Sequence, residues 1–233
     1  LTLSFMKNPS IKFVIDAGRD VRNYVVFNKY SDKKFLKMFL PAELHYINKN
    51  FSKSEKEKII REYVGRNFRI FKKDINKNVK GTRAAWNLKK GQYFRLVNRI
   101  FKNYPWPKGD YVAFASVFNM YPRHIQEKTF HFSGREINLA TIAHEMLHFI
   151  FFDYIKSKYK IRDGQRLKNK KYVWNVSEVF NLVIETWKPY KKIFKTHGRP
   201  YDVSHARMLP MMKKIWKKRE DIDYLLDNYF KKE

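Results

Sequence analysis

One long segment without proline or glycine, residues 135–159, constrains the fold more than any other part of the sequence. Ser133 and Glu136 precede it with the spacing of a capping box, in which a serine and a glutamate side chain bind the free N–H groups at a helix start. We therefore expect one long amphipathic helix that begins at Ser133 and ends near Tyr159. Its apolar residues recur at helical spacing and predict the face turned to the core: Leu139, Ala143, Met146 and Ile150.

The same helix carries His144, Glu145 and His148 in the pattern H-E-x-x-H. Residues four apart lie on one face of a helix, so both imidazoles can reach a single metal ion. Imidazole nitrogen is a good ligand for zinc. The carboxylate of Glu145, beside the first histidine, can take a proton from a water that attacks a carbonyl group. The alternative is a pair of partly buried histidines on an amphipathic helix, which leaves Glu145 beside them unexplained.

The residues around this motif, 141–150, resemble the extended active-site signature of the zincin metallopeptidases. In that signature a threonine or valine often leads, and the positions around the histidines are uncharged or apolar. The resemblance implies a zincin fold, with an active-site helix between an upper subdomain containing a sheet and a lower helical subdomain. It also implies one zinc ion per chain, a peptide or protein substrate, and Glu145 as general base. It is specific over this segment and only architectural elsewhere.

The zincin subgroups differ in their third metal ligand. Metzincins continue the motif with a glycine and a third histidine, whereas here Phe-Ile-Phe-Phe-Asp-Tyr follows. Gluzincins use a glutamate from a later helix, and Glu178 is well placed, among apolar neighbours where an unpaired carboxylate would be costly. The alternative for Glu178 is an ordinary carboxylate near a helix start, favoured by the helix dipole. Glu185, seven residues further on, is its main rival. The remaining alternatives are His197, His205 and Asp153. Peptide deformylases share the motif but use a cysteine, and this chain has none.

Further residues are candidates for other roles in such a site. Asn181 could hydrogen-bond a ligand histidine, and a capped or solvent-facing asparagine is the alternative. Many gluzincins stabilise the oxyanion with a downstream histidine or tyrosine, for which the candidates are His197, Tyr201 and His205. In zincins, the strand before the active-site helix is an edge that pairs with substrate backbone. That implies an edge strand containing Lys128, Phe130 and Phe132, with an ordinary internal strand as the alternative.

Patterns elsewhere predict an α+β fold with a small N-terminal sheet. Runs rich in β-branched and aromatic residues predict strands at residues 11–16, 24–27, 112–118 and 128–132, the last two as a hairpin or an adjacent pair. Helical patterns cover residues 52–81, after a capping box at Ser52, and then 92–102, 175–187 and 202–230, with Pro210 in the first turn of the last helix or at a kink. We expect residues 1–149 to form the upper subdomain and residues 150–233 the lower one, within one compact catalytic unit.

The charge of the chain is +28, from 50 basic and 22 acidic residues. A field of that sign attracts nucleic acid, anionic membranes or acidic proteins. Residues 156–171 alone contain eight basic residues and one acidic residue. The alternative is compositional, because the lysines are spread along the whole chain, as in proteins from AT-rich genomes.

Three function classes follow from these observations. The leading one is a zinc peptidase. The second is a nucleic-acid-associated basic protein with a zincin fold, either inactive or a protease acting on bound proteins. The third is a zinc hydrolase of non-peptide amides. The sequence has no cysteine, no clear signal peptide and no apolar run long enough to span a bilayer, so we expect a cytoplasmic protein without a transmembrane segment.

Overall fold

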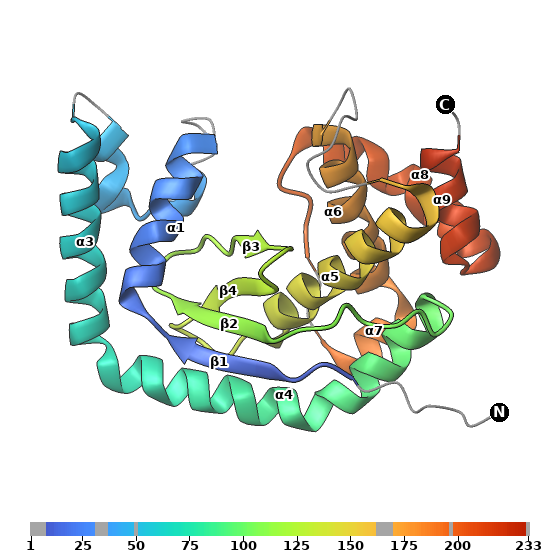
Figure 1. Ribbon diagram of the computed structural model, residues 1–233, viewed down its shortest axis with the longest axis horizontal. Coiled ribbons are helices and arrows are strands. Elements are labelled where there is room, and N and C mark those ends of the chain that lie inside the picture. Colours follow the sequence, from blue (N-terminus) through green and yellow to red (C-terminus); the bar gives the residue numbers. More distant parts are fainter. Residues whose placement is uncertain (1–7, 31–36, 49–50, 162–169, 196–197, 232–233) are drawn as a thin grey trace. The chain divides into compact units, whose positions relative to one another are not determined.

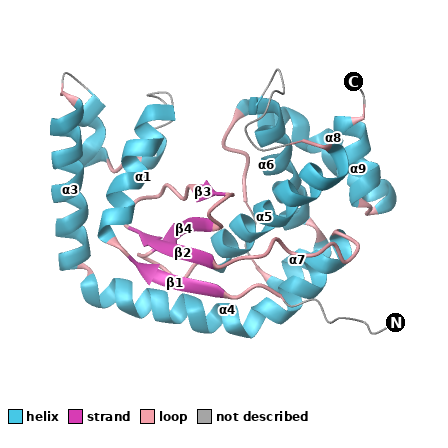
Figure 2. Cartoon of the chain, in the orientation of Figure 1, coloured by secondary structure: helices cyan, strands magenta, loops and turns pink. Residues whose placement is uncertain are grey.

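The computed structural model describes residues 8–30, 37–48, 51–161, 170–195 and 198–231. The fold is mixed α/β, mostly helical, with a four-stranded sheet (Figures 1 and 2). The chain divides into two compact units. The sheet unit contains Ser10–Trp86 and Gly109–Ile142, and the helical unit contains Leu1–Pro9, Asn87–Lys108 and Ala143–Glu233. We expected one boundary between residues 149 and 150. The observed division is discontinuous, because residues 87–108 pack with the C-terminal helices.

The sheet contains β1 (Ile11–Ile15), β2 (Tyr111–Ser116), β4 (Thr129–Ser133) and the two-residue β3 (Arg123–His124), in the order β1-β2-β4-β3 (Figure 2). The neighbours β1, β2 and β4 are parallel, and β3 is antiparallel to β4. Three of the expected strands are therefore confirmed in position. The last two form an adjacent parallel pair and not a hairpin, because β3 and its flanking turns carry the chain back before β4 begins.

The expected substrate-binding edge strand is corrected by this order. β4 lies between β2 and β3, and its residues Phe130 and Phe132 are fully buried. Lys128 precedes the strand, with a left-handed backbone at φ 52°. In the described part of the sheet, β3 and β1 are the outer strands. The strand expected at residues 128–132 is therefore an internal strand, which was the alternative. An apolar run predicts a strand but does not identify the neighbours of that strand.

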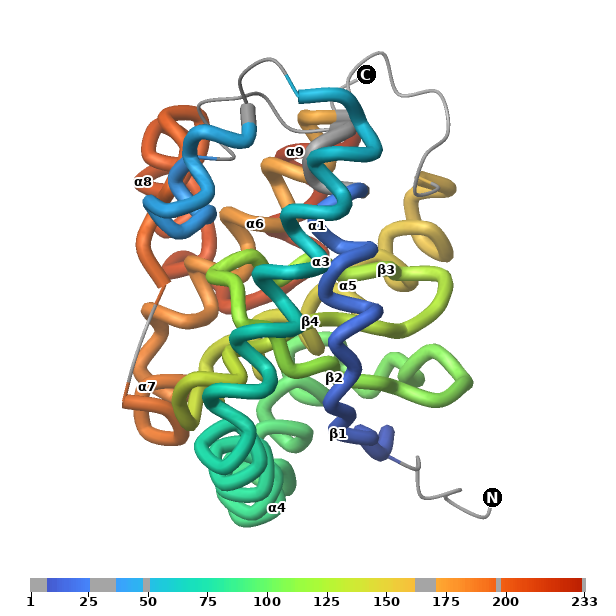
Figure 3. The backbone as a smooth tube through the Cα atoms, turned by 90° about the vertical axis from the view of Figure 1, so that its left-hand side faces the viewer, coloured from blue at the N-terminus to red at the C-terminus, as the bar shows by residue number. Residues whose placement is uncertain are grey.

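The expected strand at residues 24–27 is wrong, since these residues belong to helix α1 (Ala17–Tyr30). The start of this helix is stabilised by Asp16, whose carboxylate accepts a hydrogen bond of 2.9 Å from the backbone N–H of Arg19. Helix α3 (Lys53–Ile70) begins with the expected capping box at Ser52 and packs beside α1 (Figures 1 and 3). Capping at the start of α1 outweighs the strand propensity of Val25 and Val26.

The helix expected at residues 52–81 is broken at Phe71, which ends α3. The next helix, α4 (Lys72–Ile100), continues through Gly81, where the sequence pattern predicted an end. It also includes most of the shorter helix expected at residues 92–102. A Cβ atom at Gly81 would lie only 2.6 Å from Cδ1 of Ile137. This glycine therefore allows another segment to approach the helix closely, and it does not act as a stop signal.

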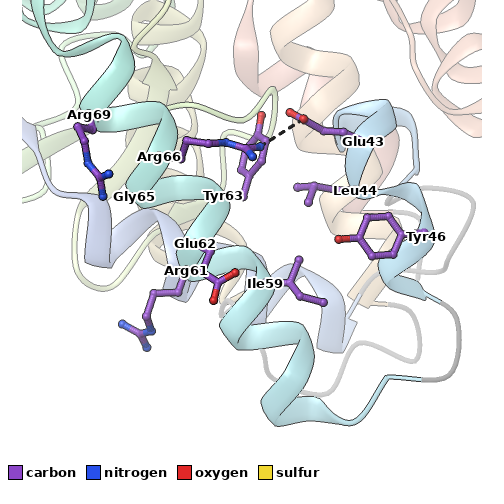
Figure 4. Close-up of a pocket in the computed structure, with 10 residues that line it drawn as sticks. All are labelled: Glu43, Leu44, Tyr46, Ile59, Arg61, Glu62, Tyr63, Gly65, Arg66 and Arg69. Carbon is purple, nitrogen blue, oxygen red and sulfur yellow. Dashed lines mark hydrogen bonds and ion pairs between the residues drawn. The ribbon is translucent and has the colours of Figure 1, made fainter.

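The sheet unit also has a groove of about 640 Å³ between α3 and the 3₁₀ helix η1 (Ala42–Asn48) (Figure 4). An ion pair of 3.4 Å joins Arg66 of α3 to Glu43 of η1 at this groove. Both side chains are more than half exposed, at 57% and 56%, so the pair contributes little stability. The groove belongs to the sheet unit, whereas the two histidines of the H-E-x-x-H motif belong to the helical unit.

A buried carboxyl group, Asp20, joins α1 to the end of β2. It accepts hydrogen bonds from Oγ of Ser116 at 2.6 Å and from the backbone N–H of Val117 at 2.9 Å. Burial raises the pKa of Asp20 from 3.8 to about 7, even though these two hydrogen bonds favour the charged form. Asp20 therefore holds its proton in the folded chain at pH values where the unfolded chain has released it.

Stability should consequently depend on pH through this one residue. Between about pH 4 and 7 the folded state binds more protons than the unfolded state, so the free energy of unfolding should fall as the pH rises. The shift corresponds to a loss on the order of 4 kcal/mol. Urea unfolding of the wild type and of Asp20→Asn across this range measures it, and the variant should lack this part of the fall. Equal pH slopes for the two proteins would refute the prediction.

The helical unit contains most of α5 (Leu139–Tyr159), together with α6 (Lys170–Thr186), α7 (Lys188–Ile193), α8 (Val203–Arg219) and α9 (Ile222–Phe230). Helix α5 begins at Leu139 and not at Ser133, because Ser133 ends β4 and the side chain of Asn138 caps the N–H of Thr141. The helix expected at residues 202–230 is two helices, interrupted at Glu220, and Pro210 lies inside α8. No helix in the described ranges is long and apolar enough to cross a bilayer.

Candidate metal centre

The H-E-x-x-H motif lies in the buried middle part of helix α5. On α5, Met146, Leu147, Phe149 and Ile150 are at most 1% exposed, so the helix is buried around most of its circumference and not along one stripe. Its neighbour α6 contributes Phe180, whose ring lies 5.1 Å from that of Phe151. This apolar packing buries His148 and Glu145 of the motif, while 21% of the His144 side chain stays exposed.

Three of the expected ligands come together at this point. Nε2 of His144 lies 3.1 Å from Nε2 of His148. The two oxygens of Glu178, on α6, lie 3.4 Å from Nε2 of His144 and 3.5 Å from Nε2 of His148. One ligand atom from each residue falls within 4.8 Å of the others, and this is the only such group of His, Cys, Asp or Glu within the described residues.

The chemistry of these donors fits a bound cation. Three electron-rich atoms converge in a buried place, where a positive charge between them satisfies all three. Burial by itself lowers the pKa of His144, but the charge and hydrogen bond of Glu185, the hydrogen bond of Glu178 and the charge of Glu145 raise that pKa well above its usual value. The surroundings of His144 therefore favour positive charge, which a metal ion would supply.

Glu185 contacts the other side of the same imidazole. Its Oε1 lies 2.6 Å from Nδ1 of His144, and its Oε2 accepts a 2.7 Å hydrogen bond from the backbone N–H of Gly198. An imidazole that donates from Nδ1 has its lone pair on Nε2, the atom that faces Glu178 and His148. The rival ligand Glu185 is thus placed to orient His144 from behind, outside the three-residue group.

Gly198 is a residue of this site that the sequence did not indicate. A Cβ atom there would lie 2.4 Å from Oε2 of Glu185 and 2.9 Å from Cδ2 of Leu182. Only glycine lets the backbone N–H approach the carboxylate this closely. Because Gly198 belongs to the segment between α7 and α8, no local pattern around the motif could reveal the contact.

Buried polar side chains also hold the backbone of α5 where the motif begins. Asn181 of α6 donates a 2.9 Å hydrogen bond to the carbonyl oxygen of His144, and Tyr93 of α4 donates a 2.8 Å bond to that of Ala143. Asn181 thus hydrogen-bonds a candidate ligand histidine, and it does so through the backbone carbonyl of that residue and not through its imidazole. It therefore fixes the separation of α5 and α6 at the site.

The structure groups two of the oxyanion candidates beside α6. The ring of His205 lies 5.0 Å from that of Tyr201 and 5.1 Å from that of Trp174, and its Nε2 lies 3.1 Å from Oδ1 of Asn175. Burial lowers the pKa of His205, while the charge of Glu178 acts in the opposite direction. Glu178 follows Asn175 by one turn of α6, so its charge acts on the His205 imidazole. The third candidate, His197, lies outside the described residues.

The remaining ligand candidate, Asp153, is engaged elsewhere in the helical unit. Its Oδ2 accepts a 2.9 Å hydrogen bond from the hydroxyl of Tyr104. It does not belong to the three-residue group. The fold and the site thus define an α/β protein with a candidate metal centre of two histidines and one glutamate on adjacent helices.

Comparisons with protein-family models, with curated proteins and with solved structures found no match to this chain. The functional argument therefore rests on the residues and the geometry of the candidate metal centre.

The contact of Glu185 with His144 leads to a prediction about metal affinity. Glu185→Gln should weaken zinc binding by roughly 10–100-fold, the usual cost of losing the partner that orients a ligand histidine. Competition with a chelating dye would measure the dissociation constant. Gly198→Ala should weaken zinc binding in the same direction, since its added methyl group must displace the Glu185 carboxylate. Unchanged zinc affinity in both variants would show that Glu185 does not orient His144.

Proposed function

We propose that this chain is a zinc-dependent peptidase of the gluzincin type. The observation that carries the proposal is the convergence of His144, His148 and Glu178, from two adjacent helices, at a point where a cation satisfies all three. The motif on α5 and the position of the glutamate on the following helix agree with the resemblance to zincins. The zincin-like arrangement of the whole chain is part of this proposal.

Zinc is the metal that this set of donors favours. Two imidazole nitrogens and one carboxylate, with no thiolate, are the protein ligands of many catalytic zinc sites, which keep one position open. His144, His148 and Glu178 would hold the ion. When bound, zinc makes water more acidic and stabilises negative charge on an oxygen.

Glu145 supplies the proton transfers. It is 5% exposed and lies next to His144 in sequence, and its charge contributes to the raised pKa of that histidine, so the carboxylate is close to the site. In the proposed reaction it accepts a proton from the water that attacks the peptide carbonyl. It then delivers that proton to the nitrogen of the leaving amine. One carboxylate thus acts first as base and then as acid.

His205 and Tyr201 are proposed to stabilise the oxygen that becomes negatively charged during the attack. Tyr201 can donate from its hydroxyl, and His205 can donate from Nε2 when this atom turns from Oδ1 of Asn175 to the substrate. The ring of His205 lies 5.1 Å from that of Trp174, which is one turn before Glu178 on α6. Removal of such a donor typically costs about 10²–10³-fold in turnover without removing the metal.

The peptidase proposal is tested with an unfolded protein, such as reduced and alkylated casein, as substrate. The zinc-loaded chain should release new amino termini, and the same chain treated with a chelator should not, until zinc is restored. Hydrolysis of small non-peptide amides with casein left intact would indicate an amidohydrolase. Intact substrates of both kinds, at full zinc occupancy, would reject a hydrolase.

A further inference from the structure

The C-terminal part of the helical unit has an unbalanced charge. Residues 188–219 contain eleven lysines and arginines and a single acidic residue, Asp202. These residues include α7 and α8, which can be followed in orange and red in Figure 3. Acidic residues that follow α8 do not offset this charge, because they form ion pairs with lysines outside residues 188–219. Lys102 lies 2.6 Å from Asp221, and Lys231 lies 2.9 Å from Asp227.

Two tryptophans fix the start of α7 beside the end of α8. Trp187, which precedes α7, donates a 2.7 Å hydrogen bond from Nε1 to Glu220, which follows α8. The ring of Trp187 also lies 5.4 Å from that of Trp216, near the end of α8. Residues one turn into α7 therefore come close to residues in the second half of α8.

Three lysines lie near this junction: Lys191, one turn after Trp187, and Lys213 and Lys217, on either side of Trp216 in α8. Lys191 and Lys217 are exposed and Lys213 is half-buried. Lys213 and Lys217 are one helical turn apart, a spacing at which like charges repel. Burial, and then the charges of Lys191 and Lys217, lower the pKa of Lys213. Within the described residues, none of the three forms an ion pair.

We propose that this lysine cluster, Lys191, Lys213 and Lys217, is the centre of a surface that binds the phosphate backbone of nucleic acid. Uncompensated lysines on two fixed helices match a polymer with regularly repeated negative charge. Lysine is a point charge that contacts phosphate without reading bases, so binding should be independent of sequence. The apolar side chains Met212, Ile215 and Trp216 of α8 are buried. In residues 211–219 this leaves Met211 as the one strongly exposed large apolar side chain, which is too little to form a membrane-inserting face.

A pair of charge-matched variants separates this surface from the general positive charge. The first is Lys191→Gln/Lys213→Gln/Lys217→Gln. The control is Lys73→Gln/Lys77→Gln/Lys80→Gln, which removes the same charge from three exposed lysines of α4 in the sheet unit. A third variant carries arginine at the three cluster positions and keeps the charge. Circular dichroism spectra should show that all three variants fold.

Binding is measured by fluorescence anisotropy with labelled oligonucleotides of 20 nucleotides, single-stranded and duplex, DNA and RNA, at several salt concentrations. The glutamine variant of the cluster should bind at least about 10-fold more weakly than the wild type, and its plot of log affinity against log salt should flatten by roughly 2–3, as three phosphate contacts are lost. The α4 control should lose less than about 3-fold. The arginine variant should bind like the wild type.

Three outcomes would overturn the proposal. Equal losses in the cluster variant and the α4 control would show that only net charge matters. Absence of binding to any oligonucleotide at about 50 mM salt would show that the surface has no affinity for nucleic acid. Binding to phosphatidylserine vesicles that is tighter than binding to oligonucleotides, and that is lost in the same variant, would assign the surface to membranes. None of these measurements depends on zinc or on peptidase activity.

Discussion

Replacing Glu145 with glutamine should reduce peptide hydrolysis by roughly 10²–10⁴-fold or more while the chain keeps one zinc ion. The residue before it, His144, points a ring nitrogen at Glu178 and His148, whereas Glu145 is not part of that three-residue group. Glutamine keeps the shape of the side chain and loses the basic oxygen. Loss of turnover without loss of metal is therefore the pattern expected of a general base.

Casein hydrolysis and elemental analysis of the same preparation give the two quantities. Glu62→Gln is a matched control, because it makes the same chemical change at an exposed residue of the sheet unit. It should leave both hydrolysis and zinc unchanged. Hydrolysis by Glu145→Gln at the rate of the wild type would remove Glu145 from the mechanism and leave the metal centre in place.

Glu178→Gln should have the opposite pattern and lose the metal itself. The variant replaces a negatively charged ligand by a neutral one beside two histidines, in a site where only 3% of the Glu178 side chain is exposed. Zinc affinity should fall by more than the roughly 10–100-fold expected for Glu185→Gln. Activity should fall with it, and high zinc concentrations should restore part of that activity.

Competition with a chelating dye ranks the three glutamates on one scale. Zinc binding should be nearly normal in Glu145→Gln, weakened in Glu185→Gln and weakest in Glu178→Gln. A larger loss in Glu185→Gln than in Glu178→Gln would mean that Glu185 is the third ligand. Normal zinc affinity in both of these variants would show that neither glutamate is a metal ligand, and it would refute the gluzincin assignment.

The parts of the fold that the sequence predicted are those set by local interactions. The capping box at Ser52 and the strands β1, β2 and β4 depend on neighbouring residues, and they occur where expected. Some errors are local, such as the strand expected at residues 24–27, but two others concern interactions between distant segments. The local sequence predicts a helix end at Gly81, because it does not reveal that Ile137 approaches this glycine. The resemblance to zincins implies an edge strand at β4, because it does not reveal that β3 lies beyond it.

The candidate site shows the same limit. His144, Glu145 and His148 are fixed by their spacing on one helix, so the sequence alone could group them. Glu178 and Glu185 are both buried on α6, two turns apart, and their spacing does not tell which of them faces the ligand nitrogens. The packing of α6 against α5 makes that choice, and it turns Glu185 toward Nδ1 of His144.

Zinc stoichiometry tests the central claim most directly. The purified wild-type chain, stripped of metal, incubated with excess zinc and then desalted, should contain one zinc ion per chain by elemental analysis. His148→Ala, prepared in the same way and shown to be folded by circular dichroism, should retain far less, because one of the three converging ligands is gone. A folded wild-type chain that takes up no zinc, or a His148→Ala variant that binds zinc as tightly as the wild type, would contradict the account.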